Sequence, residues 1–226
     1  MKIIDAQKLT LIFCFSIVCF VFSLNWLAAS QPKAWNLSNK NFFFVGREEQ
    51  LLMIHSFFKK EDRRILALTG GPGFGKTQIA KKYAQKFVDD YDLIWWFDSQ
   101  QDMPSQFEKL ATALNTLLPE KEQIIPSKMS KDALVDTIKN VLRIKQIKYL
   151  LIFDNAEDYG RIEKYIPYAH QNFKKNILLT SRIASIWPDK VEIGKFKREE
   201  SLHLIKAAMP REKKEVMVNL AQTLGD

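Results

Sequence analysis

The stretch from Thr69 to Thr77, with the sequence TGGPGFGKT, constrains this chain more than any other feature. It fits the pattern G-x-x-x-x-G-K-[ST], with Gly70, Gly75, Lys76 and Thr77 at the fixed positions. Glycines let the backbone turn tightly and point successive N–H groups at phosphate oxygens. A lysine at this position reaches the β and γ phosphates, and the hydroxyl of the last residue suits Mg²⁺. The stretch therefore predicts a loop that binds a polyphosphate.

The residues on both sides of this loop support the prediction. Ile65 to Thr69 is a short apolar run, which is typical of a buried parallel strand. Gln78 to Val88 carries apolar residues near helical spacing, which predicts a helix directly after the loop. The N-terminal amides and the dipole of such a helix favour anions. Strand, glycine loop and helix are the context that the motif requires.

A second half of the site is predicted farther along the chain. Leu150 to Asp154 is a run of four hydrophobic residues followed by an acid, which has the Walker B form. We expect Asp154 at the carboxyl end of a central strand beside the phosphate loop, where it holds Mg²⁺ through water. The alternative is that Asp154 caps the next turn. Asn155 follows where many ATPases place the glutamate base, so we expect slow hydrolysis and a nucleotide that acts more as a switch.

Arg182 ends the segment Thr180-Ser181-Arg182, directly after a predicted strand. From that position its guanidinium can reach a γ-phosphate and report its presence. The competing interpretation is an ordinary surface arginine.

Apolar runs and helical patterns alternate through the rest of the chain. Alternating strands and helices predict an α/β fold with a parallel sheet that is covered on both faces. After it we expect the start of a small helical domain. The further predicted strands are 93–97, 149–153, 177–181 and 191–193, and the further predicted helices are 48–58, 105–118 (capped by Ser105, with Glu108 in a capping box), 131–147, 198–209 and 211–224.

The N-terminal run from Leu9 to Ala29 is uncharged and almost entirely apolar. It is long enough to cross a bilayer as a helix, which predicts a membrane anchor. The alternative is a secretory signal that is cleaved near Ala28-Ala29-Ser30. Because a nucleotide-binding domain needs ATP, we expect an uncleaved anchor with the domain in the cytosol. Residues 31–41 are polar and are predicted to form a linker.

Length and charge set broader limits. With 226 residues the chain is long enough for one α/β domain and a smaller piece. Its net charge of +8 is compatible with an anionic partner. However, the basic residues are dispersed among acids, so we expect a solvated surface and no specific nucleic-acid partner.

Four segments in this order resemble the NB-ARC-type NTPases of the STAND group, the signal-transduction ATPases with numerous domains. The similarity covers about Phe42 to Asp226. Gly-Arg-Glu before the phosphate loop and Thr-Ser-Arg after it make the combination more specific than the loop alone. The segments are Phe44–Glu48, Gly70–Thr77, Leu151–Asn155 and Leu179–Arg182.

The resemblance implies roles for individual residues toward ATP or ADP and Mg²⁺. Lys76, Asp154 and Arg182 would be catalytic, with Arg182 as the γ-phosphate sensor. Thr77 and Asp154 would hold the metal. The implied cofactor-binding residues are Val45, Gly46 and Arg47 against adenine and ribose, and Gly70, Gly73, Phe74, Gly75, Lys76, Thr77 and Gln78 around the phosphates.

The resemblance also implies a mode of action. Such proteins keep ADP in a closed, inactive state, and exchange for ATP permits self-association through the nucleotide domain. The implied organisation is an N-terminal segment (1–30), a linker (31–41), an NB-ARC-like domain (42–194) and the start of an ARC1-like helical subdomain (195–226). The last predicted helix is followed only by Gly225-Asp226, with no turn or cap, so we expect a truncated product or fragment; Leu224-Gly225-Asp226 resembles the start of the family's next motif. Two alternatives stay open: an AAA+ or origin-recognition-like ATPase that acts on nucleic acid or protein, and a non-catalytic adaptor.

Overall fold

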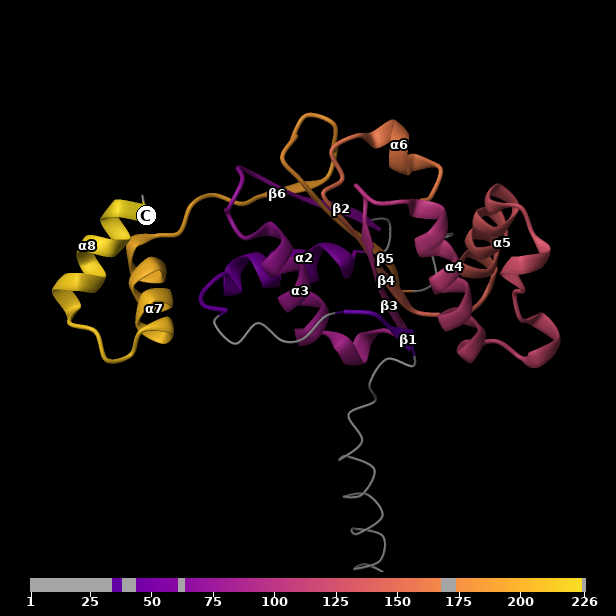
Figure 1. Ribbon diagram of the computed structural model, residues 1–226, viewed down its shortest axis with the longest axis horizontal. Coiled ribbons are helices and arrows are strands. Elements are labelled where there is room, and N and C mark those ends of the chain that lie inside the picture. The colour runs from indigo at the N-terminus through magenta and orange to yellow at the C-terminus, as the bar shows by residue number, and fades with distance from the viewer. Residues whose placement is uncertain (1–33, 38–43, 61–63, 168–173, 225–226) are drawn as a thin grey trace, which may run out of the picture. The chain divides into compact units, whose positions relative to one another are not determined.

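A six-stranded parallel sheet with helices on both faces dominates the described part of the chain (Figure 1). The computed structural model describes residues 34–37, 44–60, 64–167 and 174–224. The strand order is β1-β3-β4-β5-β2-β6. The predicted α/β fold is therefore confirmed. The strands are β1 (Ala34–Trp35), β2 (Ile65–Thr69), β3 (Leu93–Asp98), β4 (Tyr149–Asp154), β5 (Lys175–Ser181) and β6 (Lys190–Glu192).

Helices connect and cover these strands. The α-helices are α2 (Glu48–Phe58), α3 (Lys76–Lys86), α4 (Met103–Leu114), α5 (Lys131–Ile144), α6 (Tyr159–Glu163), α7 (Arg198–Ala208) and α8 (Lys214–Leu224). The short 3-10 helices are η1 (Val88–Asp90), η2 (Asn115–Leu117), η3 (Glu120–Glu122) and η4 (Pro126–Lys128).

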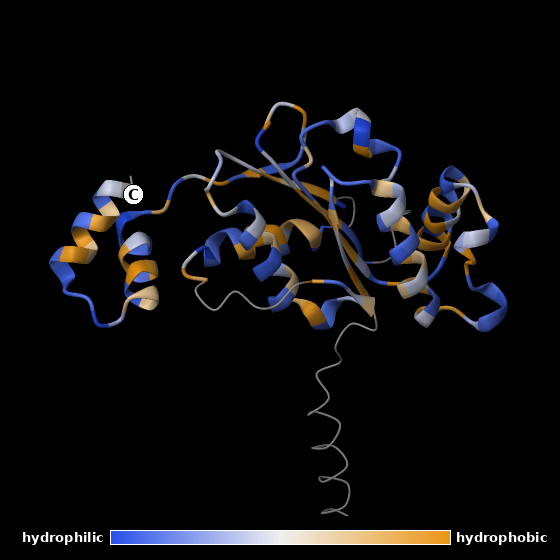
Figure 2. Cartoon of the chain, viewed as in Figure 1, coloured by the Kyte–Doolittle hydropathy of each residue, from blue (hydrophilic) through white to orange (hydrophobic). Residues whose placement is uncertain are grey.

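The central strands are buried on both faces, which explains their continuous apolar sequence. One face packs against α4 and α5, where Phe97, Phe107 and Phe153 stack with ring centroids 5.0 and 4.8 Å apart. The other face packs against α2 and α3. Hydrophobic residues accordingly gather where the helices face the sheet (Figure 2). Truncation of one stacked phenylalanine to alanine costs on the order of 3–5 kcal/mol in such a core.

The strand order decides what meets at the carboxyl edge of the sheet. β5 lies between β4 and β2, so the end of β4 is not adjacent to the glycine loop that follows β2. The chain crosses over from β2 to β3 and then returns through β4 to β5. Ligands of open α/β sheets bind at such reversals, outside the carboxyl ends of the strands.

Two helices begin earlier than the sequence predicts. α3 begins at Lys76 rather than Gln78, because Gly75 takes the left-handed conformation before the first turn. α4 begins at Met103 rather than Ser105. The predicted Ser105 cap is wrong, because the Asp102 carboxylate accepts hydrogen bonds from the Ser105 backbone N–H at 3.0 Å and from its hydroxyl at 2.6 Å.

Part of the predicted linker belongs to the sheet. Ala34 and Trp35 pair with Leu93 and Ile94 of β3 as an edge strand, so a linker over the whole of 31–41 is wrong at these residues. The next side chain, Asn36, bonds twice to the Trp96 backbone, donating at 2.9 Å and accepting at 2.6 Å. This carboxamide satisfies backbone groups on the edge of β3 beyond the two-residue strand.

Beyond β6 the chain forms the helical pair α7 and α8, which were predicted at 198–209 and 211–224. The two helices pack through a small apolar cluster of Ile205, Met217 and Ala221. The predicted membrane segment at residues 9–29 lies outside the described residues. Within the described ranges, no helix has the length and apolar character needed to cross a membrane.

Candidate functional site

The glycine loop after β2 is shaped by close backbone contact. Gly70 has a φ of 146°, and a Cβ on it would lie 2.2 Å from the Ile193 carbonyl oxygen. No side chain fits between Gly70 and the Ile193 carbonyl. Glycine is therefore required by this close contact as well as by the turn. The loop then runs into α3, whose N-terminal amides are directed toward the carboxyl edge of the sheet.

Lys76 folds back over this loop. Its ammonium donates to the Gly70 carbonyl at 2.9 Å and to the Gly71 carbonyl at 2.7 Å. Burial lowers the pKa of Lys76, and the Arg182 guanidinium lowers it further, while Asp154 and Glu157 act in the opposite direction. A partly desolvated ammonium gains more from an anionic ligand than an exposed lysine does.

Thr77 and Asp154 are brought together although 77 residues separate them. The Thr77 hydroxyl donates to the Asp154 carboxylate at 2.8 Å. The Thr180 hydroxyl, from the end of β5, donates to the same carboxylate oxygen. It also accepts from the Asn155 backbone N–H at 3.0 Å. Thr180 belongs to β5, which lies between β4 and β2, and therefore holds the Asp154 carboxylate in place beside Thr77. The threonine and aspartate oxygens match the hard-oxygen preference of Mg²⁺, which usually combines one or two protein ligands with phosphates and water.

Arg182 stands at the rim of this group and is paired with a second acid. Its Nη2 donates to Glu157 Oε2 at 2.7 Å, and its Nε bonds to Oε1 of the same carboxylate. The hydrogen bonds from Arg182 lower the pKa of Glu157, and the Glu157 carboxylate in turn raises the pKa of Arg182. The bidentate geometry is the strong form of this interaction.

These groups surround a polar pocket of about 510 Å³ at the ends of β2, β4 and β5. We call it the phosphate pocket. Its lining residues are Pro72, Gly73, Gly75, Lys76, Thr77, Gln78, Gln100, Asn155, Glu157, Thr180, Ser181 and Arg182.

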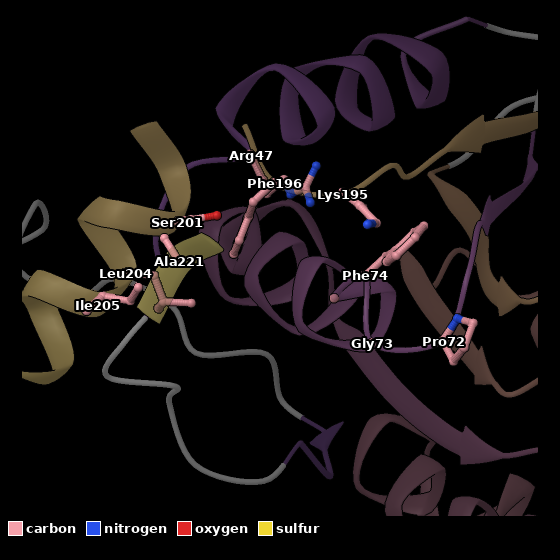
Figure 3. Close-up of a pocket in the computed structure, with 11 residues that line it drawn as sticks. Arg47, Pro72, Gly73, Phe74, Lys195, Phe196, Ser201, Leu204, Ile205 and Ala221 are labelled. Carbon is pink, nitrogen blue, oxygen red and sulfur yellow. The ribbon is translucent and has the colours of Figure 1, made fainter. Parts of the chain in front are cut away.

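A second, mainly apolar pocket of about 330 Å³ shares Pro72, Gly73 and Gly75 with the phosphate pocket. Figure 3 shows Phe74 on one side of it and the residues of α7 and α8 on the other. We call it the helical-pair pocket. The other residues that line it are Arg47, Phe74, Lys195, Phe196, Ser201, Leu204, Ile205 and Ala221.

Arg47 lies beside Phe196 in the helical-pair pocket and is one of its polar lining residues, with Lys195 and Ser201 (Figure 3). Its side chain is buried, its guanidinium lies 4.4 Å from the ring centroid of Phe196, and its Nη2 donates to the Gly194 carbonyl at 2.8 Å. The Nε of Arg47 is buried and has no hydrogen-bond partner among the described residues. Burial lowers the pKa of Arg47, against the opposing effect of Glu200. A ligand with an acceptor atom would satisfy this group.

The backbone around Arg47 takes an uncommon conformation. Gly46 and Arg47 both have positive φ, 67° and 65°. A Cβ on Gly46 would lie 2.7 Å from the Glu200 carboxylate, which also accepts from the Arg47 backbone N–H at 3.4 Å. A left-handed backbone conformation is unfavourable for arginine, and the contacts with Glu200 of α7 stabilise it here.

The structure divides the predicted site residues between the two pockets. Lys76, Thr77, Gln78 and Arg182 line the phosphate pocket, Arg47 and Phe74 line the helical-pair pocket, and both pockets share Gly73 and Gly75. Asp154 and Gly70 do not line the phosphate pocket, but each accepts a hydrogen bond from a residue that does: Asp154 from Thr77 and Gly70 from Lys76. Val45 and Gly46 line neither pocket.

Sequence reasoning missed several residues of the site. Thr180 and Glu157 belong to the phosphate pocket, and Phe196 with α7 and α8 forms much of the other pocket. The segment Thr180-Ser181-Arg182 contained part of the signal for Thr180, a hydroxyl at the end of a predicted strand, but the pairing with Asp154 also depends on the strand order. No local pattern marked Phe196, which follows β6 in an irregular segment.

Comparison with protein families places most of the chain in one of them. The model of the NB-ARC domain matches residues 48–215. A probable disease resistance protein of Arabidopsis thaliana is 28% identical over 142 residues, which cover 61% of this chain and 16% of that protein. The matched segment is thus a small part of the relative.

Solved structures show the same fold at low identity. A STAND protein with a tetratricopeptide repeat sensor from Pyrococcus horikoshii superimposes with a TM-score of 0.58 and 19% identity, covering 84% of this chain and 30% of that one. Cdc6p from Pyrobaculum aerophilum superimposes with a TM-score of 0.54 and 13% identity, covering 84% of this chain and 57% of that one.

Proposed function

Because this chain belongs to the NB-ARC family and contains its nucleotide-binding NTPase domain, we propose that it binds ATP and ADP with Mg²⁺ as a slowly hydrolysing switch. One observation carries the proposal: the 2.8 Å hydrogen bond between the Thr77 hydroxyl and the Asp154 carboxylate. It joins the phosphate loop and the Walker B aspartate at one point, which a Gly/Pro surface turn would not do.

The two pockets suggest how a nucleotide lies. Phosphates fit the phosphate pocket, where the α3 amides, Lys76 and Arg182 offer donors. The helical-pair pocket, with the Phe196 ring and the Arg47 guanidinium, suits a planar base. We expect the sugar between the two pockets, beside the shared residues Pro72, Gly73 and Gly75. Mg²⁺, held by Thr77 and Asp154, would neutralise phosphate charge.

Slow turnover follows from Asn155. This residue cannot take a proton from an attacking water, and its backbone N–H is tied to Thr180. Both oxygens of the nearby Glu157 accept from Arg182, which makes that carboxylate a weak base. We expect hydrolysis on the order of 10⁻³ s⁻¹, the scale of unassisted P-loop GTPases.

The test is a titration of the full chain with Mg·ATP, Mg·ADP and Mg·GTP by calorimetry, followed by a measurement of released phosphate. Binding of both adenine nucleotides at one site per chain, weaker binding of GTP and turnover below about 1 min⁻¹ are expected. Equal affinity for GTP would contradict the adenine assignment. The absence of binding would favour the non-catalytic adaptor.

A further part of the proposal concerns self-association. We propose that ATP promotes self-association through the nucleotide domain, so light scattering should show a larger species with an ATP analogue than with ADP.

We also propose, from the sequence, that residues 9–29 anchor the chain in a membrane with the nucleotide domain in the cytosol. The chain should then stay with membranes after an alkaline carbonate wash, and release by that wash would contradict it.

The net charge of +8 is compatible with one alternative, an ATPase that acts on nucleic acid. Binding measurements in rising salt distinguish it. A steep loss of DNA affinity with salt, together with ATP dependence, would support that function. Weak binding that does not depend on nucleotide would leave the switch as the better account.

A further inference from the structure

The ion pair between Glu157 and Arg182 is a feature that nucleotide binding alone does not require. Both side chains line the phosphate pocket, and the carboxylate engages Arg182 through two donors. The Glu157 side chain is 29% exposed and that of Arg182 is 53% exposed. The pair therefore sits on the pocket rim, partly screened by water and open to exchange of partners.

The backbone holds Glu157 in this place. The N–H of the preceding Ala156 donates to the Thr180 carbonyl at 2.8 Å, and the N–H of Glu157 donates to the Asn155 carbonyl at 3.0 Å. Asn155 itself has a φ of 57°, which turns the chain sharply after β4. Arg182 follows β5 directly, so both partners project from strand ends that are joined by the Thr180 bonds.

The charges in the pocket make this pair sensitive to the third phosphate. The described charged groups at the pocket are Lys76, Arg182 and Glu157 on the lining and Asp154 behind Thr77. A γ-phosphate offers several strong acceptor oxygens to an arginine, whereas ADP offers none at that position. ATP would therefore have to take Arg182 from Glu157. ADP leaves the pair intact.

We propose that Glu157 sets the preference of this pocket for ADP over ATP, because its ion pair with Arg182 competes with the γ-phosphate. The inference rests on the proposed function, since it concerns the same nucleotide site. Glu157 is then a specificity-determining residue that acts through Arg182, not a base for water. Its removal frees the guanidinium for the phosphate and favours ATP.

The experiment is a double-mutant cycle on the full chain. Affinities for Mg·ADP and for Mg-bound AMP-PNP, an ATP analogue with a bridging nitrogen, are measured by calorimetry for wild type, Glu157→Gln, Arg182→Ala and the double variant. Glu108→Gln is the matched control, because it removes the same charge from an exposed side chain of α4 outside the pocket lining. Thermal unfolding checks that each variant is folded.

Glu157→Gln should shift the affinity ratio toward AMP-PNP about fivefold, within the range of an ion pair on a protein surface. The control should leave the ratio unchanged. In the Arg182→Ala background the same Glu157→Gln change should have no effect on the ratio.

Two outcomes overturn the inference while leaving the proposed function intact. One is nucleotide binding with a ratio that Glu157→Gln does not change. The other is an equal shift with and without Arg182, which would mean that Glu157 acts by its charge alone. If wild type bound neither nucleotide, the proposed function would fail first and this inference with it.

Discussion

The phosphate pocket and the helical-pair pocket are built in different ways. The phosphate pocket comes from the carboxyl ends of β2, β4 and β5 and from the first turn of α3, which the parallel sheet brings to one edge. The helical-pair pocket comes from three separated regions: the turn at Gly46 and Arg47, which we call the Arg47 loop, the glycine loop and the segment from Lys195 through α8. The first depends on the sheet, and the second depends on where the helical pair packs. Substitutions in the phosphate pocket should therefore weaken binding of the phosphates, and substitutions in the helical-pair pocket should weaken binding of the base.

Lys76→Ala should have the largest effect. It removes a partly buried ammonium from the phosphate pocket, and charged hydrogen bonds to phosphate are strong. We expect ATP, ADP and inorganic tripolyphosphate all to bind at least about 100-fold more weakly, measured by calorimetry. Lys109→Ala, on the exposed surface of α4, is the control. Affinities within threefold of wild type would remove the phosphate assignment.

Asp154→Asn should come second and should depend on Mg²⁺. The substitution removes the charge that Thr77 and Thr180 hold in place. We expect about a 30-fold loss of affinity for Mg·ATP, but less than a threefold change for ADP in the presence of a chelator. An equal loss with and without Mg²⁺ would indicate a structural role for Asp154 instead of a metal site.

Phe196→Ala should separate the two pockets most clearly. It removes the ring that faces Arg47 in the helical-pair pocket, so a base loses a stacking surface. ATP and ADP should both bind about tenfold more weakly, while tripolyphosphate should bind as it does to wild type. A matching loss for tripolyphosphate would show that the pockets are not independent.

Glu200→Ala should have the smallest effect. The Glu200 carboxylate accepts from the Lys197 backbone N–H at 2.8 Å at the start of α7 and lies against Gly46 and the Arg47 N–H. Loss of this cap should lower the free energy of unfolding by about 1 kcal/mol. Nucleotide affinity should fall about two- to threefold, because the Arg47 loop loses a contact. Urea unfolding measures the first effect and calorimetry the second. A loss of affinity above tenfold would mean that the position of α7 affects both pockets.

The contrast between the pockets also explains what the sequence could predict. The fold and the core of the phosphate pocket followed from local patterns, since the glycine loop and the apolar strands carry their own periodicity. The strand order did not follow, because no single strand encodes that β5 lies between β4 and β2. Thr180 was missed as a partner of Asp154 for that reason. β1 was missed because a two-residue edge strand has no period to detect.

The helical-pair pocket could be predicted only through Arg47, Gly73, Phe74 and Gly75. Its other side depends on tertiary packing of α7 and α8 against the Arg47 loop, and amphipathic spacing does not say which surface a helix covers. The Glu157 pair was missed because its two residues lie 25 positions apart on different strand ends, and only the register of β4 with β5 makes them neighbours.

The most direct test of the central claim is native mass spectrometry of the full, folded chain at about 10 µM Mg·ADP, a concentration that largely fills a site of about 1 µM affinity and leaves a site that binds about 100-fold more weakly mostly empty. The account predicts one ADP with one Mg²⁺ per chain and loss of both in Lys76→Ala. A wild-type chain that stays folded and free of nucleotide under these conditions would contradict it.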